Sequence, residues 1–179
     1  PHSSKSELRT SRAGSTVGTL IPEETLAMIG QRLSEPVTGT ITSRDAQRFA
    51  LAAGDRNPLY FDEAAARAAG YRTTLVPPVL LAWSLNPPRP LDDLRADGLY
   101  RGEGKRVTLN VKRVMFGGEE WEFLEPVFAG DTITSETRLK SLEEKSGGSG
   151  TFVLQMTETT YTNQDGAVVA RAVGRSIAR

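Results

Sequence analysis

Cysteine is absent from this sequence, which excludes disulfide bonds, thiolate metal sites and cysteine nucleophiles. Histidine is almost absent as well, because His2 is its only instance. That residue lies in a Ser-, Arg- and Gly-rich stretch with almost nothing to bury, so we expect residues 1–18 to form a flexible tail. Chemistry that needs a histidine from the folded part of this chain has none available.

An excess of charge of either sign is missing too. Lys plus Arg and Asp plus Glu each number 22, so no overall field attracts nucleic acid or an anionic membrane. The sequence has no apolar run long enough to span a membrane, and its polar start is not typical of a signal peptide. We therefore expect a cytoplasmic protein that contacts neither nucleic acid nor membrane.

The composition is that of an ordinary globular domain, with 38% hydrophobic and 25% charged residues in a chain of 179. A chain of this length can bury a sizeable core within one domain. We expect residues 19–179 to form that domain, without internal repeats. No metal site is expected.

Helical patterns occupy the first half of the chain. Residues 22–33 begin with proline and two glutamates and carry apolar residues at helical spacing, which predicts a helix. A short strand is expected over 37–41, then a helix capped by Ser43 that runs to about Ala53 and stops at Gly54.

A second helix is expected to begin at Asp62 and to end at Gly70. Its apolar positions are all alanine (Ala64, Ala65, Ala68 and Ala69). A helix that buries only methyl groups can lie very close to whatever covers it.

The second half of the chain changes to a period of two, which is typical of strands. A strand is expected over 107–116, with a turn at Gly117 and Gly118, followed by three longer strands over 131–142, 151–162 and 167–178. One face of the last strand is small, with Val168, Ala170, Ala172, Gly174 and Ser176. We therefore predict an α+β domain in which a curved antiparallel sheet wraps around an Ala-rich central helix.

Three stretches carry a resemblance to a known family. "GDRNPLYFDEAAARAAGY" (54–71) resembles the Gly-Asp-x-Asn-Pro-hydrophobic-His signature and Ala-rich helix of the MaoC-like, (R)-specific enoyl-CoA hydratases and dehydratases. "EPVFAGDTI" (125–133) and "YTNQDGAVVARAVGRSI" (161–177) resemble that family's later strands. The chain is most similar to the FAS1-like dehydratase N-terminal subgroup, and the resemblance implies the hot dog fold.

The resemblance also implies a chemistry, the addition of water across the double bond of a trans-2-enoyl-CoA. The family activates water with the Asp and His of its motif and holds the thioester oxygen with a glycine amide. On this chain the Asp and Asn positions are Asp55 and Asn57, which are the expected catalytic residues. The His position is Tyr60 and the Gly position is Pro78, which has no N–H to donate. Tyr60 is therefore not expected to be functional as a base.

Each of these residues also has a purely structural interpretation. Asp55 is either a catalytic base or a turn residue that bonds local N–H groups. Asn57 before a proline is more typical of turn chemistry than of catalysis. Tyr60 is interpreted as a packing or interface residue, and Trp83 and Trp121 as core or subunit contacts.

A basic stretch, "YRGEGKRV", suggests a second contact with the substrate. Arg101, Lys105 and Arg106 are candidates to bind the phosphates of coenzyme A, because charge-assisted hydrogen bonds to phosphate favour such residues. The alternative is a solvated loop. Coenzyme A enters only as part of the substrate, and no separate cofactor is expected.

Three functions remain open from the sequence. The favoured one is the degenerate half of an enoyl-CoA hydratase or 3-hydroxyacyl-CoA dehydratase, which acts on acyl-CoA thioesters and pairs with a MaoC-like domain that has the histidine. The second is a self-sufficient hydratase or thioesterase that uses Asp55, and the third is a non-enzymatic acyl-CoA binding module. All three predict a homodimer or a heterodimer with a second hot dog domain.

Overall fold

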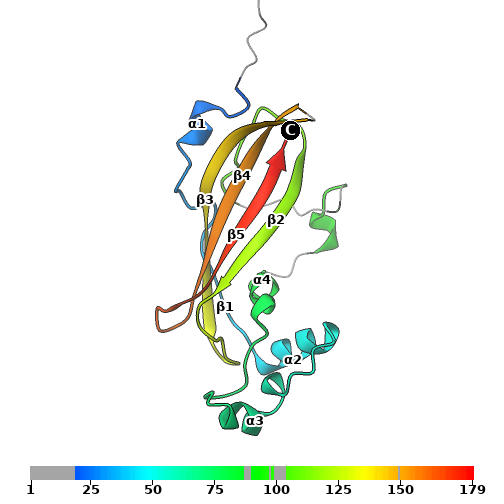
Figure 1. Cartoon of the computed structure of the whole chain (residues 1–179), viewed down its shortest axis with the longest axis vertical. Coiled ribbons are helices and arrows are strands. Elements are labelled where there is room, and N and C mark those ends of the chain that lie inside the picture. The colour runs from blue at the N-terminus through cyan, green and yellow to red at the C-terminus, as the bar shows by residue number, and fades with distance from the viewer. Residues whose placement is uncertain (1–18, 87–89, 97, 99–103, 149) are drawn as a thin grey trace, which may run out of the picture.

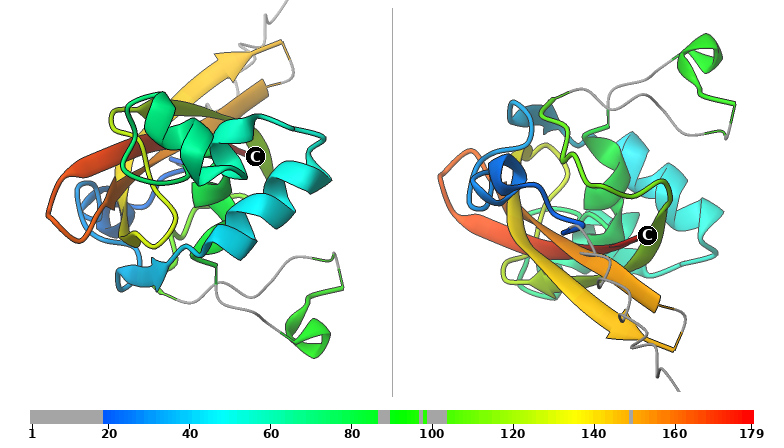
Figure 2. Two further views of the ribbon diagram at one scale, coloured as in Figure 1. Left: turned by 90° about the horizontal axis from the view of Figure 1, so that it is seen from below. Right: turned by 90° about the horizontal axis from the view of Figure 1, so that it is seen from above.

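One five-stranded antiparallel sheet dominates the computed structural model, which describes residues 19–86, 90–96, 98, 104–148 and 150–179 (Figure 1). Its strands lie in the order β1-β3-β4-β5-β2. They are β1 (Val37–Thr40), β2 (Val114–Phe123), β3 (Thr132–Gly147), β4 (Gly150–Thr162) and β5 (Val168–Ala178). Every neighbouring pair is antiparallel, and the sheet curls along its length (Figures 1 and 2). The predicted curved antiparallel sheet is confirmed.

The three long C-terminal strands lie close to where the period-two pattern predicts them. A tight turn joins β4 to β5, because the Asn163 and Gly166 amides donate to the Ala167 and Asn163 carbonyls. Gly166 has a positive φ of 81°, which favours glycine. β3 runs further than expected, to Gly147, because its last residues pair with the start of β4.

The predicted strand over 107–116 and the turn after it were wrong. β2 begins only at Val114 and continues through both glycines, where the register with β5 shifts between Phe116 and Gly118. A glycine pair suits a bulge as well as a turn, and a Cβ at Gly117 would come within 3.2 Å of the Arg175 carbonyl oxygen. The alternating apolar residues before it (Val107, Leu109 and Val111) still pack against the core, without belonging to a strand.

The first predicted helix is much shorter than its apolar spacing suggested. α1 spans only Glu23–Leu26, and both Leu26 and Ile29 are exposed. The buried residue is Thr25, whose hydroxyl donates to the Thr108 carbonyl at 2.7 Å. A polar tether to a neighbouring segment therefore fixes α1, in place of an apolar face.

α2 (Ser43–Ala52) matches the predicted helix except at its cap. The N-cap is Thr42, whose side chain accepts from the Asp45 amide while the Asp45 carboxylate accepts from the Thr42 amide. This reciprocal capping box places the N-cap at Thr42, one residue before the predicted cap Ser43. Gly54, with φ of 72°, ends the helix as expected.

The Ala-rich helix does not lie at the centre of the molecule. α3 (Glu63–Ala68) is capped by Asp62 as predicted, but its only buried residue is Ala66, and Ala64 and Ala68 are exposed. α3 lies at one end of the molecule with α2 and the 3-10 helix η1 (Pro58–Tyr60) (Figure 1). The high helix propensity of alanine favours a helix here, but the alanine methyl groups bury too little apolar area to hold this helix against the sheet.

The helical segment that faces the sheet is instead η2 (Pro78–Leu80) followed by α4 (Leu81–Ser84). Leu80, Leu81 and Leu85 belong to the larger core cluster together with Ala170 and Ala172 of β5. Two residues of the small face of β5 therefore share one core with leucines of this segment, and no residue of α3 belongs to that core. A further 3-10 helix, η3, spans Leu91–Asp93.

The core has two parts on the sheet. The larger cluster also contains further residues of α2, β3, β4, β5 and the loops between these elements (Ile41, Ala46, Val76, Val127, Ile133, Tyr161 and Val169). The smaller cluster lies where the N-terminal segment crosses the sheet (Ile21, Leu139, Leu142, Val153 and Ala178). No helix within the described ranges is long and apolar enough to cross a membrane.

Asp131, the last residue of the "PVFAGD" motif, links the helical end of the molecule to the sheet. It is 3% exposed, and its carboxylate accepts from the Phe128 amide at 2.9 Å and the Gln164 side chain at 3.2 Å. It also forms an ion pair with Arg72, whose guanidinium lies 4.3 Å above the Phe128 ring. Asp131 therefore stabilises the fold by joining these segments.

Candidate functional site

The family motif forms the turn between α2 and η1. The Asp55 carboxylate accepts from the Asn57 amide at 2.9 Å, and the Asn57 side-chain oxygen accepts from the Leu59 amide at 3.1 Å. Both residues thus make the local bonds that the turn interpretation expects. A catalytic role for either remains a prediction.

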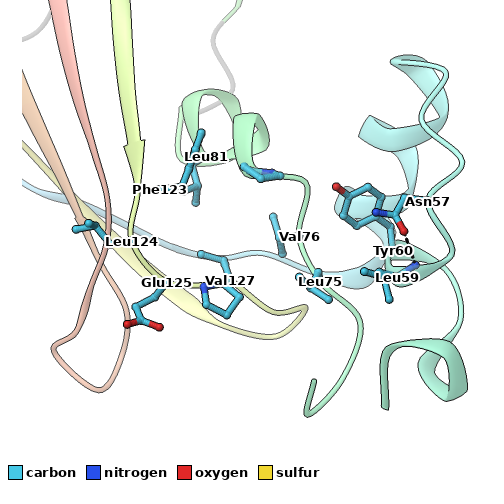
Figure 3. Close-up of a pocket in the computed structure, with 12 residues that line it drawn as sticks. Asn57, Leu59, Tyr60, Leu75, Val76, Leu81, Phe123, Leu124, Glu125 and Val127 are labelled. Atoms are coloured by element: carbon cyan, nitrogen blue, oxygen red, sulfur yellow. Dashed lines mark hydrogen bonds between the residues drawn. The ribbon is translucent and has the colours of Figure 1, made fainter. Parts of the chain in front are cut away.

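A pocket of about 280 Å³ opens beside this turn (Figure 3). Its walls come from η1, from the η2–α4 segment and from the end of β2 with the residues that follow it. The lining is mostly apolar (Leu59, Leu75, Val76, Pro78, Leu81, Phe123, Leu124, Pro126 and Val127). Asn57, Tyr60 and Glu125 supply its polar groups, and Figure 3 shows Glu125 on the side away from Tyr60.

Tyr60 occupies the position where the family has its histidine. Its side chain is 8% exposed and lines the pocket. Burial raises the pKa of the Tyr60 hydroxyl above the usual value of 10.0, the negative charge of Asp55 raises it further, and the Asn57 side chain partly offsets both. The hydroxyl is therefore protonated at neutral pH and can donate a hydrogen bond, but it cannot accept a proton from water.

Asp55 does not compensate for the missing base within the pocket. It is exposed, and it is not among the residues that line the pocket. Its negative charge raises the pKa of Tyr60, but its carboxylate accepts a hydrogen bond from the Asn57 backbone N–H. Of the two expected catalytic residues, only Asn57 contacts the cavity.

Pro78 occupies the position where the family has its amide-donating glycine. It begins η2 and lines the same pocket as Tyr60. Proline has no N–H, so this position cannot hold a thioester oxygen. The arrangement can enclose an apolar group and offer it the Tyr60 hydroxyl, but it lacks the histidine and the backbone donor of the family motif.

Lys105 and Arg106 are not among the residues that line this pocket. The Lys105 amide donates to the Leu33 carbonyl at 2.7 Å, and its ammonium donates to Gln31 at 3.0 Å. Leu33 in turn bonds to Thr137 of β3, whereas the Tyr60 pocket adjoins β2, and β4 and β5 separate these two strands. Arg106 is exposed, and Arg101 lies outside the described residues. Their contact with coenzyme A phosphates remains a prediction.

The sequence reasoning missed the wall formed by the end of β2. Phe123, Leu124 and Glu125 line the pocket, although they lie more than sixty residues from the motif. Trp121 is confirmed as a core contact, because its ring stacks on Tyr161 with centroids 5.2 Å apart.

The curled antiparallel sheet and the Gly-Asp-x-Asn-Pro turn together define a class of protein. Comparison with known proteins identifies the family. Residues 27–172 match the family described as "FAS1-like, dehydratase domain region". The chain therefore belongs to this family.

One curated relative is the probable enoyl-CoA hydratase alpha subunit of Thermomonospora curvata, which is 31% identical over 156 residues. The match covers 80% of this chain and 47% of that protein, so the chain spans about half of its length. What that protein does as a whole is thus not transferred directly.

Solved structures confirm the hot dog fold. A chain of the ChsH1-ChsH2 complex from Mycobacterium tuberculosis matches with a TM-score of 0.68 at 20% identity, covering 87% of this chain and 89% of that one. A chain of the 3R-hydroxyacyl-ACP dehydratase complex HadBC from the same organism matches with a TM-score of 0.59 at 22% identity, covering 84% and 96%. MaoC-like dehydratases and (R)-hydratases share the fold as well.

Proposed function

We propose that this chain is the degenerate half of an enoyl-CoA hydratase or 3-hydroxyacyl-CoA dehydratase that acts on acyl-CoA thioesters. Its partner is a second hot dog domain that carries the complete Asp/His pair. In this arrangement the chain shapes the acyl site and stabilises the partner, while the partner activates water.

The observation that carries the proposal is the state of the Tyr60 pocket. Two chemical groups that the reaction needs, a base and an amide donor, are replaced in one place by Tyr60 and Pro78. The apolar walls nevertheless form a pocket that suits part of an acyl chain. A site that keeps its shape but lacks its base supports a binding half that depends on another domain.

The hydration reaction itself defines which chemical groups the partner must supply. In hydration the oxygen of water bonds to the β-carbon, the carbon–carbon double bond becomes single, and the α-carbon takes up a proton. This requires a base for water, an acid for the α-carbon and a donor for the thioester oxygen. The buried Tyr60 hydroxyl can donate a hydrogen bond but cannot act as the base, so in this proposal the partner supplies the base.

Two relationships point in the same direction. The relative from Thermomonospora curvata is named an alpha subunit, and two structural neighbours are chains of complexes. The family membership supports a hydratase or dehydratase as the general activity.

A hydration assay tests the proposal. The purified chain is given trans-2-enoyl-CoA thioesters, alone and together with MaoC-like chains of the same genome that keep the Asp/His motif. We expect no turnover by the chain alone, turnover by a pair, and little effect of Asp55→Asn in that pair. Turnover by the chain alone that Asp55→Asn abolishes would identify a self-sufficient hydratase or thioesterase instead. Binding of acyl-CoA without turnover in any combination would identify a binding module.

The double variant Tyr60→His/Pro78→Gly provides a matched test, because it restores both missing groups in one pocket. If the geometry of the family site is otherwise intact, this variant gains hydration activity that wild type lacks. The single variants serve as controls, since each restores only one group.

A further inference from the structure

Tyr60 is a buried hydrogen-bond donor whose proton has no acceptor in the part of the chain that the structure describes. The residue is only 8% exposed, and its hydroxyl donates to none of the described residues. Buried tyrosine hydroxyls normally have a partner. The hydroxyl lies at the end of the ring that faces the opposite wall of the pocket, where Val76 and Leu81 lie (Figure 3). It is therefore free to bind a ligand there.

Asn57 leaves the Tyr60 proton available. The Asn57 side-chain oxygen accepts from the Leu59 amide at 3.1 Å, so the NH₂ group is the half of this side chain that can still act. The hydrogen bond between the Asn57 and Tyr60 side chains lowers the pKa of Tyr60, as expected when an N–H donates to the phenol oxygen and stabilises its charged form. The phenol oxygen thus accepts from Asn57, and its O–H is left for a different acceptor.

Other donors beside the hydroxyl are already used or missing. The Leu75 amide donates to the Leu59 carbonyl at 2.9 Å, and the Val76 amide has a carbonyl partner at 2.8 Å. Pro78 has no N–H at all. Among these residues, the Tyr60 hydroxyl is the one donor left to bind an oxygen atom of a ligand.

The charges around the pocket decide which kind of oxygen it accepts. Asp55 lies outside the lining, but its negative charge raises the pKa of Tyr60. Glu125 lines the pocket on the side away from Tyr60, and none of the described lining residues is Lys, Arg or His. A carboxylate in this pocket would meet negative charge, find no cation and lose its hydration to apolar walls. A neutral carbonyl oxygen faces none of these obstacles.

The apolar walls suit the atoms on either side of such a carbonyl. An acyl thioester has a neutral carbonyl between an alkyl chain and a sulfur atom, and both neighbours tolerate apolar surroundings. The free acid that hydrolysis of this thioester releases is a carboxylate at neutral pH. The pocket therefore favours the thioester over the acid.

We propose that the Tyr60 hydroxyl holds the carbonyl oxygen of an acyl thioester in this pocket, and that Asn57 positions the hydroxyl. Tyr60 takes over the task of the amide that is missing at Pro78, while the charges of Asp55 and Glu125 select against carboxylates. The identity of the ligand as an acyl thioester rests on the function proposed above. The chain then binds the reacting group itself, in addition to supporting a partner.

Two ligands that differ by one carbonyl oxygen test this proposal. Hexanoyl-CoA has no double bond to hydrate, and the thioether S-hexyl-CoA has a methylene in place of the carbonyl. We expect the full chain to bind hexanoyl-CoA about five- to tenfold more tightly, as one hydrogen bond provides. Tyr60→Phe abolishes this preference. Tyr71→Phe is the matched control, because Tyr71 contacts the Phe128 ring outside the pocket lining, and it leaves both Kd values unchanged.

The infrared stretch of an isotope-labelled thioester carbonyl gives a second readout, which a merely structural role of Tyr60 would not move. A hydrogen bond lowers this frequency, so we expect a lower value in wild type than in Tyr60→Phe. Asn57→Asp keeps an acceptor for the Leu59 amide but replaces the NH₂ group by an oxygen that takes the Tyr60 proton itself. This variant therefore loses the frequency shift although the tyrosine is present. Thermal unfolding of each variant verifies that the fold is intact.

Competition by hexanoate tests the selection by charge. Asp55→Asn removes one negative charge beside the hydroxyl, so hexanoate competes about two- to fivefold better for this variant than for wild type. Equal competition for both proteins would refute the role of Asp55 in this selection.

Equal binding of the two CoA derivatives to wild type, a comparison that needs no variant, would overturn the carbonyl site. A preference that survives Tyr60→Phe, or the absence of any binding of hexanoyl-CoA, would overturn it too. A pair that hydrates enoyl-CoA although this chain shows no carbonyl preference would leave the proposed function intact. A Tyr60-dependent preference without hydration by any pair would refute that function and leave the carbonyl site.

Discussion

Replacement of Asp131 by alanine removes the carboxylate that holds the end of the "PVFAGD" segment. The buried Phe128 amide loses a charged acceptor, which costs about 1.5–3 kcal/mol for a hydrogen bond of this kind. The Gln164 contact adds about 1 kcal/mol. The Arg72 side chain is 55% exposed, so its ion pair contributes only about 0–1 kcal/mol. We expect the free energy of unfolding to fall by about 2.5–5 kcal/mol.

Urea denaturation followed by tryptophan fluorescence measures this loss. Arg72→Gln is the matched control, because it removes the exposed partner and leaves the buried acceptor, and it costs about 1 kcal/mol or less. Asp131→Asn gives an intermediate loss, since its oxygen can still accept from Phe128 while its NH₂ group faces the Arg72 and Gln164 donors. A loss below about 1 kcal/mol for Asp131→Ala would refute the structural role.

Other predictions address the cap, the central helix and the buried tyrosine. Thr42→Ala lowers the free energy of unfolding by about 1 kcal/mol while Ser43→Ala changes it little, because Thr42 is the cap; equal losses in urea denaturation would contradict this. Leu81→Ala costs about 2–5 kcal/mol and Ala64→Ser less than about 0.5, because the leucine faces the sheet and the alanine does not; the reverse order would place α3 in the core. Burial, with a contribution from the charge of Glu119, raises the pKa of Tyr161 to about 12, above the unfolded value of 10.0, so stability falls as pH rises between these values. Tyr161 contributes a slope of about 1.4 kcal/mol per pH unit, and Tyr161→Phe removes this contribution and leaves that of Tyr60, whose pKa is also raised; an unchanged slope in Tyr161→Phe would contradict the assignment.

Local sequence determined the parts of the fold that local physics governs. Strand alternation located β3, β4 and β5, because a period of two separates a buried from an exposed face whatever the neighbours are. Turn chemistry located the β4–β5 turn, and Asp62 and Gly54 marked the start of α3 and the end of α2. The family motif likewise identified Tyr60 and Pro78 as the positions where a base and an amide donor are missing.

Only the tertiary structure decided which elements meet. A glycine pair permits either a turn or a bulge, and pairing with β5 selected the bulge at Gly117. The alanines of α3 predicted a central helix, but burial of larger apolar side chains stabilises more, so the leucine-rich α4 segment faces the sheet instead. The pocket likewise joins η1 to the end of β2 across more than sixty residues, which no local pattern encodes.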